Sequence, residues 1–169
     1  ETVTALRKLL PLLAENNVTL NQLNGVVISK GPGSYTGLRI GVSTAKGLCY
    51  TLGIPLIAIN TLESLAYRVQ NTSDCYIIPM LDARRMEVYS AVFNAEGNQI
   101  RDIKAEVLDE SSFKDYLNES KVYFIGNGVA KTKPLIKNDN AVFIEDKLPS
   151  ADNMSKLAYA KYKKSDIED

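Results

Sequence analysis

Apolar residues follow two different patterns in the first part of the chain. Residues 2–15 place valine or leucine every three to four positions, which predicts an amphipathic helix with one wide apolar face. Val26–Ser29 and Leu56–Ile59 are short apolar runs of the kind that form buried strands. Between them Ser34 is a good helix cap, and the Gly-Ile-Pro at residues 53–55 ends the helix that it begins. This region therefore predicts helices that alternate with strands.

The pattern changes beyond residues 70–74, a polar stretch that indicates a linker after a short helix from Thr61 to Arg68. Five apolar or alternating segments then predict strands, at Tyr76–Leu81, Glu87–Phe93, Gln99–Leu108, Val122–Ile125 and Ala141–Ile144. Two more helices are expected, one from Ser111 or Ser112 to Asn118 and one from Asn153 to Lys163 with Asp152 as its cap. Together the patterns predict an α/β protein with two lobes, residues 1–69 and residues 70–169.

The distribution of charge supports the same division. Residues 1–69 hold 6 basic and 3 acidic side chains, whereas residues 70–169 hold 14 basic and 17 acidic ones. The whole chain is balanced, with 20 of each kind, which argues against a broadly basic nucleic-acid binder. No apolar run approaches the length that a membrane span needs. The sequence has no histidine, which excludes histidine bases and histidine-ligated metals.

A stripe of small side chains is the most informative local feature. Gly33, Gly37, Gly41 and Ala45 recur every four positions along the helix that Ser34 begins. Each glycine costs a helix about 1 kcal/mol relative to alanine, so the stripe indicates that another backbone approaches closely. That backbone belongs either to the chain's own sheet or first helix, or to a helix of a second protein. The glycines before the helix match neither the Walker phosphate loop nor the dinucleotide-binding fingerprint.

Two stretches of the sequence resemble a known family. Lys-Gly-Pro-Gly-Ser-Tyr-Thr-Gly-Leu-Arg-Ile-Gly at residues 30–41, followed by Gly-Ile-Pro-Leu at residues 53–56, is similar to the TsaB (YeaZ) family. Met-Leu-Asp-Ala-Arg-Arg at residues 80–85 fits the opening of the same family's second lobe. The resemblance implies an actin-like (ASKHA, ribonuclease H-like) two-lobe fold. Family members usually carry three further strands before the first helix and a tail after the last one, so we expect the fold to be incomplete at both ends of this chain.

The resemblance also implies a function. Members of the family help to make threonylcarbamoyladenosine on the tRNA adenosine beside the anticodon. They are described as non-catalytic partners of the TsaD (Kae1-like) threonylcarbamoyl transferase, together with the ATPase TsaE. We therefore expect a cytoplasmic scaffold subunit that meets tRNA only through the complex, without a catalytic residue, cofactor or metal of its own. The alternative is an enzyme that acts alone, either a nucleotide-binding enzyme of the ASKHA class or a glycoprotease-like peptidase.

Two turns of the second lobe correspond to parts of the nucleotide site in this fold class. Asp82, Arg84 and Arg85 lie in the turn that would approach the phosphates, and Gly126 and Gly128 lie in the turn near the adenosine. Alanine and arginine stand where close backbone approach to phosphate favours glycine, so we do not expect ATP hydrolysis by this chain alone. The two arginines either bind phosphate through their side chains or belong to a solvated turn in which Asp82 pairs locally with Arg84.

The resemblance places the expected partner-binding surface on the first two helices. The candidate residues are Leu6, Leu10, Leu13, Tyr35, Gly37, Arg39, Gly41 and Val42. The leucines give the first helix more apolar surface than two strands require, and Tyr35 and Arg39 lie one turn apart on the second helix. These side chains either cover strands that the chain does not contain or pair with equivalent helices of TsaD or of a second copy. Because both partners would use one surface, we expect a homodimer in isolation that TsaD separates.

Overall fold

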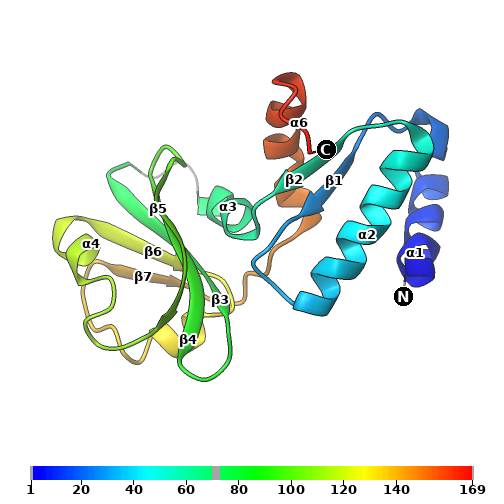
Figure 1. Ribbon diagram of the computed structural model, residues 1–169. Coiled ribbons are helices and arrows are strands. Elements are labelled where there is room, and N and C mark those ends of the chain that lie inside the picture. Colours follow the sequence, from blue (N-terminus) through cyan, green and yellow to red (C-terminus); the bar gives the residue numbers. More distant parts are fainter. Residues whose placement is uncertain (1, 70–72, 169) are drawn as a thin grey trace. The chain divides into compact units, whose positions relative to one another are not determined.

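The computed structural model describes residues 2–69 and 73–168, and in the first helix it describes side chains from Arg7 onward. The chain forms two compact units, Glu1–Asn60 with Met154–Asp169, and Thr61–Asn153 (Figure 1). This division differs from the predicted one at residue 69. The last helix belongs with the first unit, and the short helix that begins at Thr61 belongs with the second.

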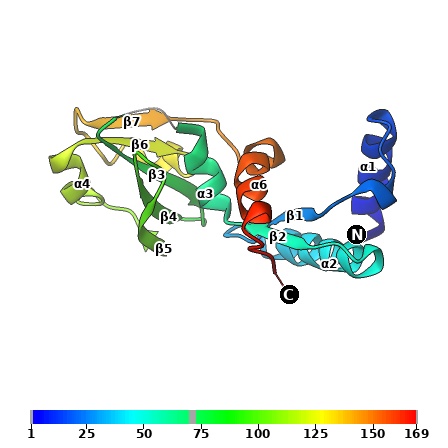
Figure 2. The ribbon, with the colours of Figure 1, turned by 90° about the horizontal axis from the view of Figure 1, so that it is seen from above.

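The first unit is built on a parallel pair of strands, β1 (Val26–Ser29) and β2 (Leu56–Ile59). Its helices are α1 (Thr2–Glu15), α2 (Tyr35–Leu52) and α6 (Ser155–Lys163), with the short 3₁₀ turn η1 (Leu20–Gln22). The 3₁₀ turn η3 (Ala151–Met154) spans the boundary between the two units. The helix α2 connects the two strands and packs on β1, α1 contacts α2, and α6 packs on β2 (Figure 2).

Alternate strand residues of the first unit point to opposite faces of the pair. Val26, Ile28 and Leu56 pack with Ala45 and Cys49 of α2. On the other face Val27, Ile57 and Ile59 pack with Met154, Leu157 and Ala158. Both faces of this small sheet are therefore covered by a helix, as a parallel pair requires.

The second unit is a mixed sheet of five strands in the order β5-β4-β3-β6-β7. The strands are β3 (Cys75–Asp82), β4 (Glu87–Asn94), β5 (Gln99–Val107), β6 (Lys121–Ile125) and β7 (Ala141–Ile144). The first three are antiparallel neighbours, whereas β6 and β7 run parallel to β3. The helices are α3 (Thr61–Ala66), α4 (Lys114–Glu119) and α5 (Val129–Thr132), with the 3₁₀ turn η2 (Tyr67–Val69) after α3.

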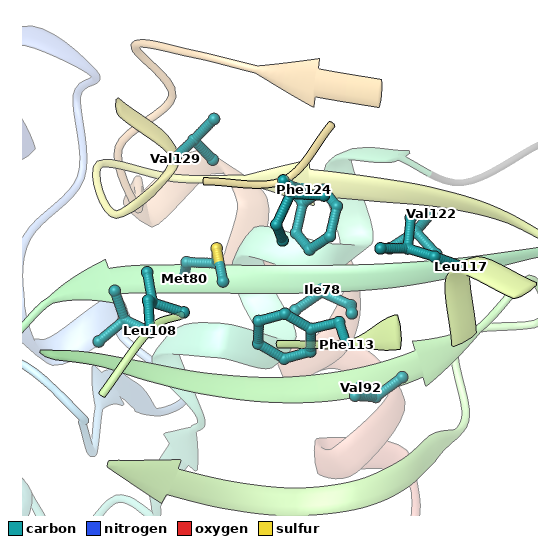
Figure 3. Packing of buried hydrophobic residues seen from close by; sticks show 11 residues of the cluster. Ile78, Met80, Val92, Leu108, Phe113, Leu117, Val122, Phe124 and Val129 are labelled. Carbon is teal, nitrogen blue, oxygen red and sulfur yellow. The ribbon is translucent and has the colours of Figure 1, made fainter. Parts of the chain in front are cut away.

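The core of the second unit lies on both faces of this sheet. Figure 3 shows one face, where Ile78, Met80, Val122 and Phe124 pack with Phe113 at the start of α4, Leu117 within α4 and Val129 of α5. On the opposite face Ile77, Leu81 and Ile125 pack with Leu62, Leu65 and Ala66 of α3. The apolar runs predicted for β3 and β6 therefore contribute to two apolar layers, one on each face of the sheet.

All seven predicted strands are confirmed, each within one residue at either end. The starts of two helices are predicted wrongly. Ser111 and Ser112 do not begin α4, because both bond with Asp109 in a tight turn and Phe113 stands at the N-cap with a φ of 63°. Asp152 does not cap the last helix, because it lies within η3 and α6 begins at Ser155. The segments η1 and α5 are not predicted from the sequence.

Candidate functional site

Local sequence fixes both ends of α2, the helix that carries most of the expected partner-binding residues. The Ser34 hydroxyl accepts a hydrogen bond from the Gly37 N–H at 3.4 Å, as predicted for its cap. Gly53 ends the helix with a φ of 65°, a left-handed conformation that glycine adopts without strain. The helix therefore begins and ends at defined residues. These ends determine which side chains belong to the helix and can lie on its outward face.

The four small residues of the predicted stripe do not share one environment. Gly33 precedes the helix, and a side chain added at Gly37 would meet only Ser34. A Cβ atom added at Gly41 would lie 3.2 Å from Cδ1 of Ile28 in β1, and Ala45 is buried in the same contact. The predicted partner-facing role of Gly41 is therefore corrected: this glycine lets α2 approach the chain's own strand.

A different stripe of α2 faces outward. Tyr35, Arg39, Val42, Lys46 and Tyr50 recur every three to four positions and define what we call the α2 stripe. Two of them are large and strongly exposed, Tyr35 at 74% and Tyr50 at 92%, and Val42 is half-buried. The Arg39 guanidinium lies 5.3 Å from the Tyr35 ring centroid and donates a hydrogen bond of 3.4 Å to its hydroxyl. Lys46 and Tyr50 were not predicted, although the same spacing from Tyr35 could have identified them.

The helix α1 adds exposed leucines. Leu10 is 49% exposed and Leu12 is 56% exposed, whereas Leu13 is half-buried. The side chain of Leu6, the remaining predicted residue, lies outside the described residues. The first unit therefore presents apolar side chains on α1 and a tyrosine–arginine pair on α2.

A second group of candidate residues meets at the carboxyl ends of β3 and β6. The Asp82 N–H donates to Oδ1 of Asn127 at 2.9 Å, and the Gly128 N–H donates to the carbonyl of Met80 at 3.2 Å. The two turns that the sequence singled out are thus in direct contact, as the parallel pairing of β3 and β6 requires.

Packing explains both glycines of the second turn. A Cβ atom on Gly126, which has a φ of 120°, would lie 2.1 Å from the carbonyl oxygen of Met80. On Gly128 it would lie 2.9 Å from the Met80 Cβ and 3.1 Å from Cγ1 of Val88. The distances of 2.1 and 2.9 Å to Met80 are shorter than real Cβ atoms tolerate, so these positions require glycine whether or not a nucleotide binds.

Lys131 of α5 forms hydrogen bonds with residues on both sides of the turn between β3 and β4. Its mostly buried ammonium group donates to Oδ1 of Asp82 at 2.9 Å, to the carbonyl of Arg85 at 2.6 Å and to the carbonyl of Glu87 at 3.0 Å. The Arg84 N–H donates to the same Asp82 oxygen at 2.6 Å. These hydrogen bonds, first that from Lys131 and then that from Arg84, hold the pKa of Asp82 below its usual value. Asp82 pairs with Lys131, not with the Arg84 side chain as predicted.

Lys131 was not predicted as part of this site. Its contacts with residues 82–87 span 44 to 49 positions of the sequence, so no local pattern identifies it. Nowhere in the described part of the chain do three His, Cys, Asp or Glu side chains gather so that they could hold a metal ion. No helix among the described residues is long and apolar enough to cross a membrane.

Comparison with known proteins identifies similar sequences along almost the whole chain. The family model of TsaD, tRNA N6-adenosine threonylcarbamoyltransferase, matches residues 4–167. A Bacillus subtilis protein named tRNA threonylcarbamoyladenosine biosynthesis protein TsaB is 34% identical over 143 residues, which are 81% of this chain and 61% of that protein. A Haemophilus influenzae protein of the same name is 29% identical, over 94% of this chain and 73% of its own length.

Solved structures support the fold. The structure of YeaZ from Pseudomonas aeruginosa matches with a TM-score of 0.80 and 23% identity, over 99% of this chain and 79% of that one. A second structure from the same organism, titled as an uncharacterized protein with similarity to peptidase YeaZ, matches with a TM-score of 0.78 and 24% identity, over 96% and 77%. The predicted α/β fold is thereby confirmed. The chain spans 61% of the Bacillus subtilis relative and 39% of an Escherichia coli TsaB, so it corresponds to part of their length.

The close packing at Gly126 predicts a large loss of stability on substitution. Gly126→Ala should lower the free energy of unfolding by about 3 kcal/mol or more, because the added methyl group meets a backbone carbonyl. Gly47→Ala is the control: its Cβ meets nothing within 4 Å, and it should raise stability by about 0.5 to 1 kcal/mol as a helix-interior replacement. Urea unfolding followed by circular dichroism measures both. A Gly126→Ala protein as stable as the parent would contradict this packing.

The lowered pKa of Asp82 predicts a stability that depends on pH. The charged carboxylate is favoured in the folded state, so its contribution is present above the ordinary aspartate pKa and is lost as the pH falls through the lower folded value. Asp82→Asn should therefore destabilise the protein at pH 7, and the difference from the parent should shrink below about pH 4. Unfolding curves from pH 7 to pH 2.5 test this, with exposed Asp139→Asn as control. A difference that stays constant across the range would refute the linkage.

Proposed function

This chain belongs to the TsaD family of tRNA N6-adenosine threonylcarbamoyltransferase proteins, and we propose that it is a non-catalytic, TsaB-like scaffold subunit that binds the TsaD transferase. The observation that carries the proposal is the outward-facing α2 stripe beside the exposed leucines of α1. In this proposal the chain supports threonylcarbamoylation of the tRNA adenosine beside the anticodon. It meets tRNA, and the ATPase TsaE, within the complex.

The chemistry of the α2 stripe suits a protein interface. Tyrosine and arginine are the residue types most often found as anchors at the centre of such interfaces, since each combines a large apolar body with hydrogen-bonding groups. The contact between Arg39 and the Tyr35 ring favours one arrangement of the two side chains, which lowers the entropy cost of binding. Exposed leucines on α1 extend the apolar area available to a partner.

The second unit supports a scaffold over an enzyme. Asp82, the carboxylate of the turn that approaches phosphates in this fold class, is engaged by the Lys131 ammonium. The glycines of the neighbouring turn are required by packing against Met80, so they are no evidence for a nucleotide. A sequence without histidine also has no general base of the commonest kind. In this proposal catalysis belongs to the partner.

The same surface serves a second copy when the transferase is absent. An exposed apolar area is unfavourable in water, so isolated molecules gain by covering it with each other. A homodimer of this kind is the weaker assembly, and TsaD displaces it by binding the same residues. We place the protein in the cytoplasm on this account, because its partners act on tRNA there.

The α2 stripe predicts which side chains TsaD binding depends on. Tyr35→Ala combined with Arg39→Ala should weaken the affinity of the full-length protein for TsaD by at least about 10-fold, since anchors of this type commonly contribute more than 1 kcal/mol each. The matched control is Tyr159→Ala with Lys163→Ala, which removes a similar exposed pair from α6, where the ammonium lies 4.6 Å from the ring. Isothermal titration measures both. Equal losses in the two variants, or none in the first, would contradict the proposal.

The alternative, an enzyme that acts alone, predicts turnover without partners. Under the scaffold proposal, purified full-length protein should hydrolyse neither ATP nor a peptide substrate above the rate of the Asp82→Asn variant. A coupled phosphate-release assay measures the first activity, and release of a fluorescent peptide fragment measures the second. Turnover that Asp82→Asn abolishes would favour the enzyme.

A further inference from the structure

We propose that the turn between β3 and β4 binds RNA phosphate through Arg84 and Arg85. The inference rests on the proposed function in one respect, because that function supplies tRNA as the nucleic acid in the complex. The structural evidence is independent of the α2 stripe, since the turn belongs to the second unit. It consists of the backbone conformation of the two arginines, the hydrogen bonds that hold the turn and the charges around it.

Both arginines have a backbone conformation that their residue type seldom adopts. The φ angles are 72° at Arg84 and 46° at Arg85, in the region where glycine and asparagine are favoured. Two successive residues of this kind make the hairpin less stable than a turn of asparagine or glycine would. Local stability therefore does not explain why arginine occupies these two positions, and a role for the side chains does.

Hydrogen bonds to its backbone and to the Asp82 side chain hold the turn in place. Lys131 donates to the carbonyls of Arg85 and Glu87, and Asp82 accepts from the Arg84 N–H. Asn127 in turn accepts from the Asp82 N–H. All of these bonds use backbone groups of the turn or the side chain of Asp82. The side chains of Arg84 and Arg85 are exposed, and they project from a backbone that is already ordered.

The two guanidinium groups keep their charge available. Asp82, the adjacent carboxylate, is neutralised by Lys131, and neither arginine forms an ion pair with an acidic residue in the described part of the chain. Each guanidinium group is planar and donates several hydrogen bonds, which suits phosphate oxygens. The turn therefore presents two positive charges, from consecutive residues, that no acidic side chain among residues 2–69 and 73–168 pairs with.

The surroundings favour an RNA backbone over a small nucleotide. The hollow beside Gly126 and Asn127, about 250 Å³ in volume, has Glu145 and Asp146 in its wall, and these carboxylates disfavour bound phosphate. The arginines instead occupy the exposed end of a hairpin, where a phosphodiester chain can pass. The second unit holds 11 basic and 15 acidic side chains, so the turn is a local contact and not part of a broad basic surface. Phosphate contacts of this kind position RNA without reading its sequence.

The test measures binding of a tRNA transcript to the complex of the full-length protein with TsaD. Arg84→Asn with Arg85→Asn removes both charges and places at each position a residue that tolerates positive φ. Affinity should fall several-fold at low salt, and the slope of log K against log salt should become shallower by about 1 to 2, as expected for one or two lost phosphate contacts. The unfolding midpoint should stay the same or rise. Lys114→Gln with Lys137→Gln, which removes two exposed charges elsewhere on the same unit, should leave the slope unchanged.

Each outcome decides the inference. An unchanged slope in the arginine variant, or an equal change in the lysine control, overturns it. Loss of ATP binding with unchanged tRNA binding also overturns it, and assigns the turn to a nucleotide. Co-purification with TsaD is measured first, because failure to form that complex contradicts the proposed function and not the inference. In that case the same salt titration is made on the full-length protein alone, and the same change of slope supports the inference while its absence overturns it.

Discussion

The ammonium group of Lys131 is the contact on which the second unit's site depends. It lies among three oxygen atoms, Oδ1 of the Asp82 carboxylate and the backbone carbonyls of Arg85 and Glu87. A charged donor that is mostly buried must be fully paired, so the turn takes the shape that surrounds it. One interaction thus pairs the carboxylate of this turn and holds the backbone from which the two arginines project.

Glycine allows close packing at a different place in each unit. At Gly126 and Gly128 it allows the ends of β3 and β6 to approach so closely that Met80 and Val88 occupy the space of a side chain. At Gly41 it allows α2 to pack closely on Ile28 of β1. Because small residues turn inward there, the stripe that begins with Tyr35 turns outward. The binding surface that we propose is a consequence of this inward packing.

The sequence predicts the strands well because each is a short apolar or alternating run bounded by turn residues. It predicts the candidate site only in part. Asp82, Gly126 and their neighbours were identified through resemblance to a family, but their physical roles depend on Lys131 and Met80, which lie far from them in the sequence or on another strand. The predicted start of a helix was wrong where a side chain forms a competing local hydrogen bond. Asp109 bonds with both Ser111 and Ser112, one or other of which was expected to begin α4. Long-range contacts, and local hydrogen bonds that compete with helix capping, leave no periodic signal in the sequence.

The central claim is that the chain acts by presenting α1 and α2 to the transferase. Hydrogen exchange of the full-length protein, measured by mass spectrometry with and without TsaD, tests it most directly. The account predicts slower exchange in peptides covering residues 7–15 and 35–52 when TsaD is present, with no change in the peptides of β7 and α4. Slower exchange confined to β7 and α4, with α1 and α2 unaffected, would contradict the account.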